Sequence, residues 1–278
     1  MNLEQAIAGI EVGEPQVFGG LAVFPLMGKE NGKRDYLTLN EAFDRKGIEI
    51  SEVSEGGSVP ELRLKNLLDQ DVFAADGETL LGAKQNRVLN SSIYVKAKDE
   101  IVIPVSCVER GRWRYQRRDF RASEYSEFLS SRAAKMASVG QRLKATGTDR
   151  YSDQGAVWDA MEQRCMSFEA DAPTRSMADI YDARRERLDQ YLHQFKPQRD
   201  QVGMACAIDG NTVSVEMFED PGVFGQFFDK LIRAYAAEVV HEHKVATMVP
   251  DKEALKDLLH QIAVSRWDEY PAVGSGKE

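Results

Sequence analysis

The spacing of apolar residues changes once along the chain, and this change limits the folds that the sequence can adopt. Apolar and polar residues alternate over residues 93–97 and again over residues 101–107. Alternation of this length predicts β-strands. From residue 121 onward, apolar residues recur every three to four positions, which predicts amphipathic helices. The sequence therefore predicts a sheet-rich segment, residues 15–120, followed by a helix-rich segment, residues 121–270.

Two Asp-Gly pairs add a prediction about connections between strands. Asp76-Gly77 and Asp209-Gly210 each stand between two apolar segments. Asp-Gly readily adopts the positive φ angles of a two-residue turn, so each pair predicts a tight hairpin. Pro104 lies inside the second alternating segment and lacks an N–H group, which predicts an edge position or irregular pairing there.

These patterns together predict an α+β fold. We expect an N-terminal body with mostly antiparallel strands and a helical second half. Within that second half, the Asp209-Gly210 hairpin adds two further strands. That addition favours one interwoven domain over residues 1–270 rather than two separate domains, although 278 residues have room for either. Residues 271–278 (PAVGSGKE) have the composition of a disordered tail.

Composition excludes several classes of protein. The formal charge of -9 and the pI of about 5.2 argue against broad nucleic-acid binding, which depends on clustered Lys and Arg. No apolar run is long enough to cross a membrane, and the N-terminus lacks the pattern of a secretory signal. The three cysteines form no disulfide pattern, so we expect a cytoplasmic protein. No metal-binding motif is present in the sequence, and no metal site is expected.

The polar segment GAKQNR, residues 82–87, is the first candidate site. Gln85 and Arg87 can present amide and guanidinium donors together, which favours an anion or nucleotide clamp. The alternative is a solvated loop whose amide side chains satisfy nearby backbone groups.

The second candidate site is the segment CVERGRW, residues 107–113. Strict alternation places Glu109 on the apolar face of its strand, where a carboxylate needs a partner or a cleft. Arg87 and Arg112 are the candidate partners. If the site is enzymatic, Glu109 could act as a general base or a metal ligand, and Cys107 is either a nucleophile or, with better support, a core residue.

The segment that follows interleaves arginines with aromatic residues (RGRWRYQRRDFR, residues 110–121). Such a segment could stack bases and contact phosphates. A surface segment whose arginines pair with acidic side chains, or one that binds a small phosphorylated ligand, are the alternatives.

The blocks DGETLLGAKQNR, PVSCVERGRWRY and GMACAIDGNTVSVEMFEDPGVFGQFF resemble the ARG and rhodanese-phosphatase-superfamily-associated protein domain family. What the resemblance implies is a role in the metabolism of NAD or ADP-ribose derivatives, proposed mainly from gene neighbourhoods. The positions that match the family's motifs are Glu78, Gly82, Gln85, Arg87, Cys107, Glu109, Arg112, Trp113, Glu216 and Phe218.

Two hypotheses follow. In the first, the protein binds or processes a small anionic nucleotide: Arg87 and Arg112 hold phosphate, Trp113 stacks on the base, and Glu78 or Glu109 supplies acid-base function. In the second, the same residues, Gln85 among them, form a structural polar network in a noncatalytic interaction or scaffold module. The residues alone specify neither a reaction, a cofactor nor an oligomeric state.

Overall fold

The computed structural model describes residues 3–28, 34–240 and 248–276 of the chain. Contacts group the chain into two compact units, and each unit combines segments that are distant in the sequence. Unit 1 consists of residues 1–34 and 185–268, and unit 2 consists of residues 35–184 and 269–278. The units therefore do not coincide with the sheet-rich and helix-rich halves, and one cooperative domain over residues 1–270 stays a prediction.

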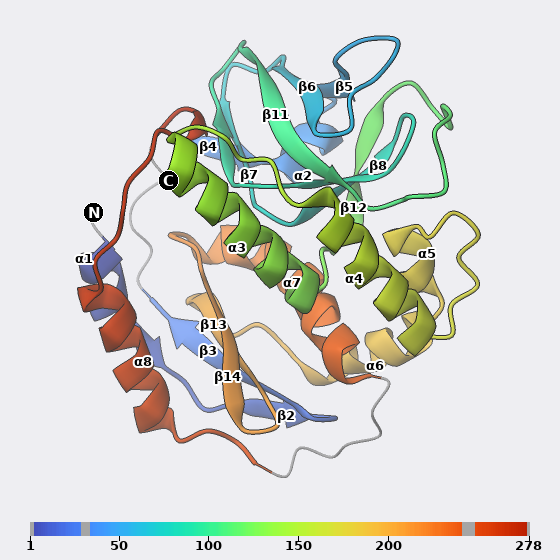
Figure 1. The fold of residues 1–278 in the computed structure, drawn as a ribbon. Helices are drawn as coiled ribbons and strands as arrows, with labels where there is room; N and C mark the ends of the chain where they lie inside the picture. The colour runs from blue at the N-terminus through green and yellow to red at the C-terminus, as the bar shows by residue number, and fades with distance from the viewer. Residues whose placement is uncertain (1–2, 29–33, 241–247, 277–278) are drawn as a thin grey trace. The chain divides into compact units, whose positions relative to one another are not determined.

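Unit 1 is built on an antiparallel sheet with the strand order β1-β3-β13-β14, in which β2 also pairs with β3. The long helix α7 packs on β13, and α1 packs against α8, so that the two segments lie side by side (Figure 1). The sheet's core face carries Phe24, Ala205 and Ala207. The elements of unit 1 are α1 (Leu3–Ala8), β1 (Glu11–Val12), β2 (Gln16–Phe18), β3 (Leu21–Met27), α6 (Arg185–Gln194), β13 (Gln201–Ile208), β14 (Asn211–Met217), α7 (Pro221–Val239) and α8 (Lys252–Val264).

The predicted hairpin at Asp209-Gly210 is confirmed. It joins β13 to β14, with Ile208 paired to Asn211. Asp209 has φ 49° and Gly210 has φ 80°, the two positive angles that this turn requires.

Unit 2 contains a six-stranded sheet with the order β12-β8-β9-β11-β6-β5 and a four-stranded sheet with the order β15-β10-β7-β4. Apolar side chains from both sheets form one core cluster. The elements of unit 2 are β4 (Tyr36–Thr38), α2 (Leu39–Asp44), β5 (Ile48–Glu52), β6 (Glu61–Asn66), β7 (Asp71–Ala74), β8 (Glu78–Gly82), β9 (Arg87–Leu89), β10 (Ile93–Val95), β11 (Glu100–Cys107), β12 (Phe120–Ser126), α3 (Leu129–Thr146), α4 (Gln154–Ser167), α5 (Met177–Asp182) and β15 (Val273–Gly274).

The hairpin predicted at Asp76-Gly77 is wrong. This turn connects β7 of the four-stranded sheet to β8 of the six-stranded sheet, and the two strands do not pair with each other within the described sheets. The reason is tertiary: the Asp76 carboxylate lies 2.8 Å from both Arg132 Nε and Lys135 Nζ of α3. These contacts tie the turn to α3, so the chain passes from one sheet to the other.

Pairing around Pro104 is irregular, as predicted. Residues 100–104 of β11 pair with β6, whereas residues 105–107 pair with β9. The strand therefore changes partner next to the residue that has no N–H group to donate. This change brings Cys107, at the end of β11, opposite Arg87, at the start of β9.

The α+β class is confirmed, with mostly antiparallel strands in the N-terminal half and helices in the second. Two boundaries differ from the sequence prediction. β12 crosses the predicted change at residue 121, and β15 pairs in parallel with β10 inside the segment predicted as a disordered tail. Ser275 N–H donates to Tyr94 O at 2.9 Å, and this bond anchors the segment to the sheet. Among the helices of the described ranges, none has the length and apolar character needed to cross a bilayer.

Candidate functional site

The two motif segments meet at one end of the six-stranded sheet. Residues 82–87 connect β8 to β9, and residues 107–113 follow β11. The first connection is held in a fixed shape: Gly82 has φ 145°, and Asn86 Oδ1 accepts its N–H at 3.1 Å. A Cβ on Gly82 would lie 2.3 Å from Asp119 O, so this position requires glycine.

Glu109 and Arg112 form a buried bidentate ion pair. Arg112 Nε donates to Glu109 Oε1 at 2.7 Å, and Arg112 Nη2 donates to Glu109 Oε2 at 2.6 Å. Glu109 also accepts from Asn86 N–H at 3.0 Å and from Thr174 Oγ1 at 2.9 Å. Arg112 Nη1 donates to Ala83 O at 2.6 Å. The expectation that Glu109 needs a charged partner is met by Arg112, and four donors already engage its two oxygens.

Gln85 links this ion pair to Arg87 and Cys107. Gln85 Nε2 donates to Glu109 O at 3.0 Å, and Gln85 Oε1 accepts from Arg87 Nη1 at 3.0 Å. The Cys107 thiol donates to the same oxygen at 3.2 Å. Burial raises the pKa of Cys107, and the nearby charge of Arg87 opposes that rise. A buried thiol in this state supports the interpretation of Cys107 as a core residue rather than a nucleophile.

Arg87 is the least satisfied of these side chains. Its side chain is fully buried, and within the described part of the chain its Nε and Nη2 have no hydrogen-bond partner. The nearest carboxylate is Glu52, whose Oε1 lies 4.0 Å from Arg87 Nη2. Glu52 Oε2 is also buried and lacks a partner among the residues that the structure describes. Burial lowers the pKa of Arg87, and the nearby Cys107 and Glu52 side chains oppose this effect.

Two exposed aromatic rings lie next to this buried pair. Trp113 is 48% exposed and Tyr115 is 46% exposed. Lys84 Nζ lies 5.2 Å from both ring centroids and donates to Glu55 O and Gly56 O at 2.6 and 2.7 Å. Arg87 Cζ lies 5.8 Å from the Trp113 ring, so this ring covers the guanidinium. We call Glu52, Lys84, Arg87, Trp113 and Tyr115 the aromatic-arginine site.

Glu78 stands at the start of β8, about 13 Å of strand away from Gly82. Leu80, two residues further along β8, pairs with Arg87 of β9. Glu78 Oε2 accepts from Ala75 N–H at 3.0 Å, so this oxygen holds the turn before β8. The hydrogen bonds and ring contacts described above join Gln85, Arg87, Glu109, Arg112 and Trp113, and Glu78 takes part in none of those bonds.

Glu52 lies outside every segment that the sequence predicted as a site, whereas Lys84 and Tyr115 lie inside predicted segments but were not singled out. A signal for Glu52 was present, because alternation along β5 places it on the same face as Ile48 and Ile50, and that face is buried. This is the argument that identified Glu109. Nothing local in the sequence pairs Glu52 with Arg87, since 35 residues and three intervening strands separate them along the chain.

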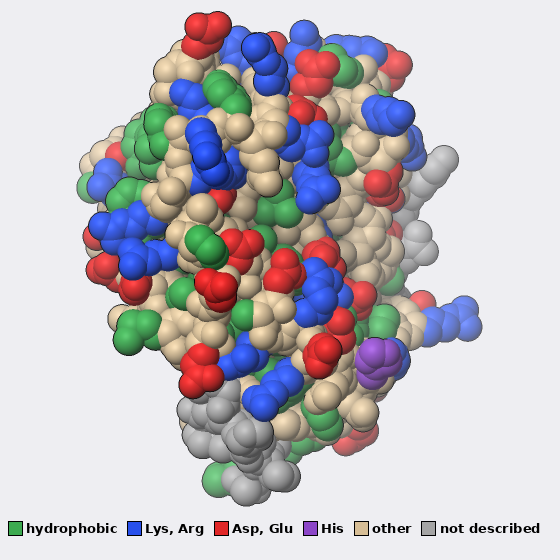
Figure 2. All heavy atoms as spheres, turned by 90° about the vertical axis from the view of Figure 1, so that its right-hand side faces the viewer, with side chains coloured by type: hydrophobic (Ala, Val, Ile, Leu, Met, Phe, Trp, Pro, Cys, Tyr) green, Lys and Arg blue, Asp and Glu red, His purple; other side chains and the backbone are tan. Residues whose placement is uncertain are grey.

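The other arginines of residues 110–121 are exposed, and two of them make surface contacts that do not involve the site. Arg117 forms a bidentate pair with Asp119, with distances of 2.9 and 2.8 Å, and Arg110 Cζ lies 5.1 Å from the Trp158 ring centroid. On the face shown in Figure 2, Lys and Arg side chains alternate with Asp and Glu side chains rather than forming a continuous basic surface.

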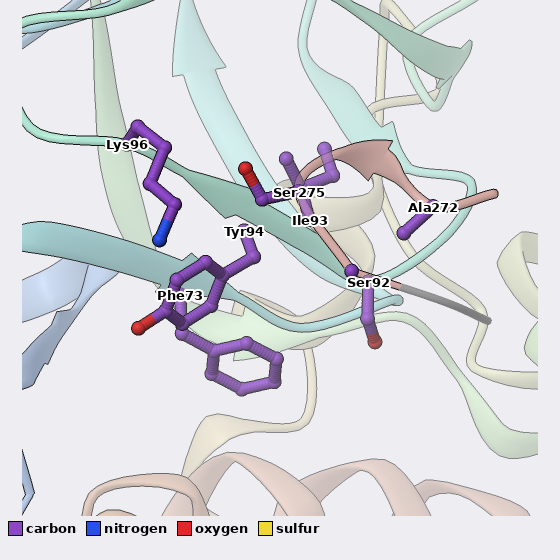
Figure 3. A pocket seen from close by; sticks show the side chains of 8 residues that line it. Phe73, Ser92, Ile93, Tyr94, Lys96, Ala272 and Ser275 are labelled. Atoms are coloured by element: carbon purple, nitrogen blue, oxygen red, sulfur yellow. The ribbon is translucent and has the colours of Figure 1, made fainter.

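A separate cavity of about 460 Å³ lies on the four-stranded sheet (Figure 3). Phe73 and Tyr94, which are paired in register on β7 and β10, form its aromatic wall. Lys96, Ser92 and Ser275 also line it. This cavity contains none of the residues that the sequence predicted as a site. Within the described ranges, no group of three or more His, Cys, Asp or Glu residues has an arrangement suited to a metal ion.

These observations define the class: an α+β protein whose motif segments form a buried Gln-Arg-Glu network beneath exposed aromatic rings. The chain belongs to the family described as the ARG and Rhodanese-Phosphatase-superfamily-associated Protein domain, whose family model matches residues 9–278. Comparison with curated proteins and with solved structures found no match.

Proposed function

We propose that this protein binds a small anionic nucleotide of the NAD or ADP-ribose type at the aromatic-arginine site. In this proposal the base stacks on Trp113 or Tyr115, and Lys84 and Arg87 contact the ribose-phosphate part. The observation that carries the proposal is Arg87: a fully buried guanidinium, covered by a half-exposed tryptophan, with two nitrogens that have no partner among the described residues.

The energetics favour a ligand at this position. A buried charged donor without a partner costs about 1–3 kcal/mol or more, and a ligand oxygen would recover that free energy on binding. Stacking of a base on an exposed aromatic ring contributes about 1–3 kcal/mol. Lys84 donates two hydrogen bonds, so its ammonium group retains a third donor for a phosphate oxygen.

The same geometry supports binding more strongly than catalysis by Glu109. Both Glu109 oxygens accept charge-assisted or backbone hydrogen bonds, so proton abstraction by this carboxylate would require breaking the pair with Arg112. We therefore propose that Glu109 positions residues 82–87 beneath the aromatic rings. Catalytic roles for Glu78 and Glu109 stay predictions.

A noncatalytic scaffold module is the second candidate function. The observation that favours it is the buried Glu109–Arg112 pair, which joins both motif segments to Thr174. The two functions differ in one respect: a scaffold needs this network but has no need of an exposed ring at residue 113.

Calorimetry with ADP-ribose and NAD tests the proposal, with Trp113→Ala as the variant. Trp267→Ala is the matched control, because Trp267 is similarly exposed and lies in the other unit. We expect the Trp113 variant to bind about tenfold or more weakly, as the loss of one stacking contact predicts, and the control to bind normally. If neither compound binds the wild-type protein, the proposal is wrong.

A further inference from the structure

We propose that Glu52 and Arg87 together recognise a ribose hydroxyl group of the ligand; this inference rests on the proposed function and makes it more specific. The two side chains are buried next to each other, yet Arg87 Nη2 and Glu52 Oε1 are 4.0 Å apart, too far for a direct hydrogen bond. Arg87 Nε and Nη2 lack acceptors and Glu52 Oε2 lacks a donor within the described residues.

The chemistry of the two groups selects the ligand atom. A guanidinium only donates hydrogen bonds, and an ionised carboxylate only accepts them. A phosphate oxygen would satisfy Arg87 but would be repelled by Glu52, and an ammonium group would be repelled by Arg87. A hydroxyl group can accept from Arg87 and donate to Glu52 at the same time. The pair therefore favours an alcohol, and both of its hydrogen bonds would be charge-assisted.

The free oxygen of Glu52 faces the aromatic end of the site. An ideal Cβ at Gly57 would lie 3.3 Å from Glu52 Oε2, 3.3 Å from Trp113 Cζ2 and 3.2 Å from Lys84 Cδ. The three side chains thus converge on one point beside Gly57, which has φ 76° and no side chain of its own. The Lys84 ammonium group lies 5.2 Å from the centroid of the Trp113 ring, and Glu52 lies beside both side chains. Groups suited to the base, the ribose and the phosphate of a nucleotide are therefore neighbours at this site.

The side chains of Glu52 and Arg87 are buried, and the Trp113 ring lies over Arg87, so entry of the ligand requires this ring to move. Trp113 is half-exposed and belongs to the connection between β11 and β12, so its movement would break no strand pairing.

The test uses calorimetry on the full chain and compares ADP-ribose with 2′-deoxy-ADP-ribose and 3′-deoxy-ADP-ribose. Each analogue lacks one of the two hydroxyl groups of the adenosine ribose. We expect the wild-type protein to bind one deoxy analogue at least tenfold more weakly than ADP-ribose. Glu52→Gln should bind ADP-ribose more weakly and should lose this discrimination, because its amide cannot act as an anionic acceptor. Tyr94→Ala, in the cavity of Figure 3, is the control and should behave like the wild type.

Equal binding of ADP-ribose and both analogues by the wild-type protein would overturn the inference and leave the proposed function intact. If Glu52→Gln does not fold, the comparison of ADP-ribose with its two analogues on the wild-type protein still tests the inference. Loss of ADP-ribose binding in Tyr94→Ala but not in Glu52→Gln would place the ligand in the cavity of Figure 3. That result would also overturn the inference. If ADP-ribose does not bind at all, the proposed function fails, and the inference fails with it.

Discussion

Two ion pairs with the same geometry allow a direct test of the buried network. Arg112 with Glu109, and Arg117 with Asp119, are both bidentate pairs through Nε and Nη2. They differ in burial: the side chains of the first pair are 7% and 6% exposed, whereas those of the second are 43% and 61% exposed. Replacing the carboxylate in each pair by Ala therefore compares a buried pair, with its further hydrogen bonds, with an exposed pair of the same geometry.

Glu109→Ala leaves the Arg112 guanidinium buried without a counter-charge, and it also removes the acceptor of Asn86 N–H and Thr174 Oγ1. Removing one member of a buried pair costs about 3–5 kcal/mol, whereas an exposed pair contributes about 0–1 kcal/mol. For a domain of this size, 1 kcal/mol shifts the Tm by about 2–4 °C. We therefore expect Glu109→Ala to lower the Tm by roughly 6–20 °C, and Asp119→Ala by far less.

Thermal unfolding followed by tryptophan fluorescence is the assay. Trp113 and Trp158 lie in unit 2 with the network, whereas Trp267 lies in unit 1, so a Trp267→Phe background makes the signal report on unit 2. Equal losses for Glu109→Ala and Asp119→Ala would refute the reasoning, because burial would then have no energetic consequence. An additional Arg112→Met substitution should recover part of the stability, since it removes the stranded charge.

Three further predictions concern other charged groups of unit 2. Lys135→Met should lower the free energy of unfolding, measured by urea titration, by about 3–5 kcal/mol. The reason is that the fully buried Lys135 Nζ lies 2.8 Å from carboxylate oxygens of both Asp76 and Glu127, which the substitution leaves without a counter-charge. Unchanged stability would contradict this prediction. The pKa of Asp179 is raised by burial first and then by nearby carboxylates, so its ionisation destabilises the fold as pH rises above the ordinary value of 3.8. Asp179→Asn should accordingly raise the Tm at pH 7 but not below about pH 4. An equal change of Tm at both pH values would contradict a raised pKa for Asp179. The hydrogen bond to Glu61 and burial raise the pKa of Tyr151 to about 12. Ultraviolet titration should therefore find one tyrosine that ionises at higher pH than the ordinary value of 10, and Glu61→Gln should bring its pKa back toward that value.

Much of the local structure could be predicted from the sequence because its causes are local. Alternation over residues 101–107 and the Asp209-Gly210 turn correspond to β11 and to the hairpin of β13 and β14. Glu109 is buried, although residues 103–108 are buried on both faces and the alternation predicted for this segment does not extend to their burial. The sequence predicted that this carboxylate needs a partner or a cleft, with Arg87 and Arg112 as the candidate partners, and it is paired with Arg112.

The sequence could not decide which distant groups meet. Asp76-Gly77 has the same dipeptide as the confirmed hairpin, but Asp76 binds Lys135, 59 residues away, and the turn joins two sheets. Glu78 matches the family's motif, and its side chain accepts from the backbone of the preceding turn, a role that no sequence pattern specified.

By itself, the sequence determined the periodicity of several elements and the need to pair buried charges, because these depend on neighbouring residues. Only the tertiary structure decided that Arg112, not Arg87, neutralises Glu109, and that Arg87 lies beside Glu52 under Trp113. The physical reason is that strand pairing between β5, β6, β11 and β9 sets these neighbours, and such pairing joins segments whose separation no local pattern encodes.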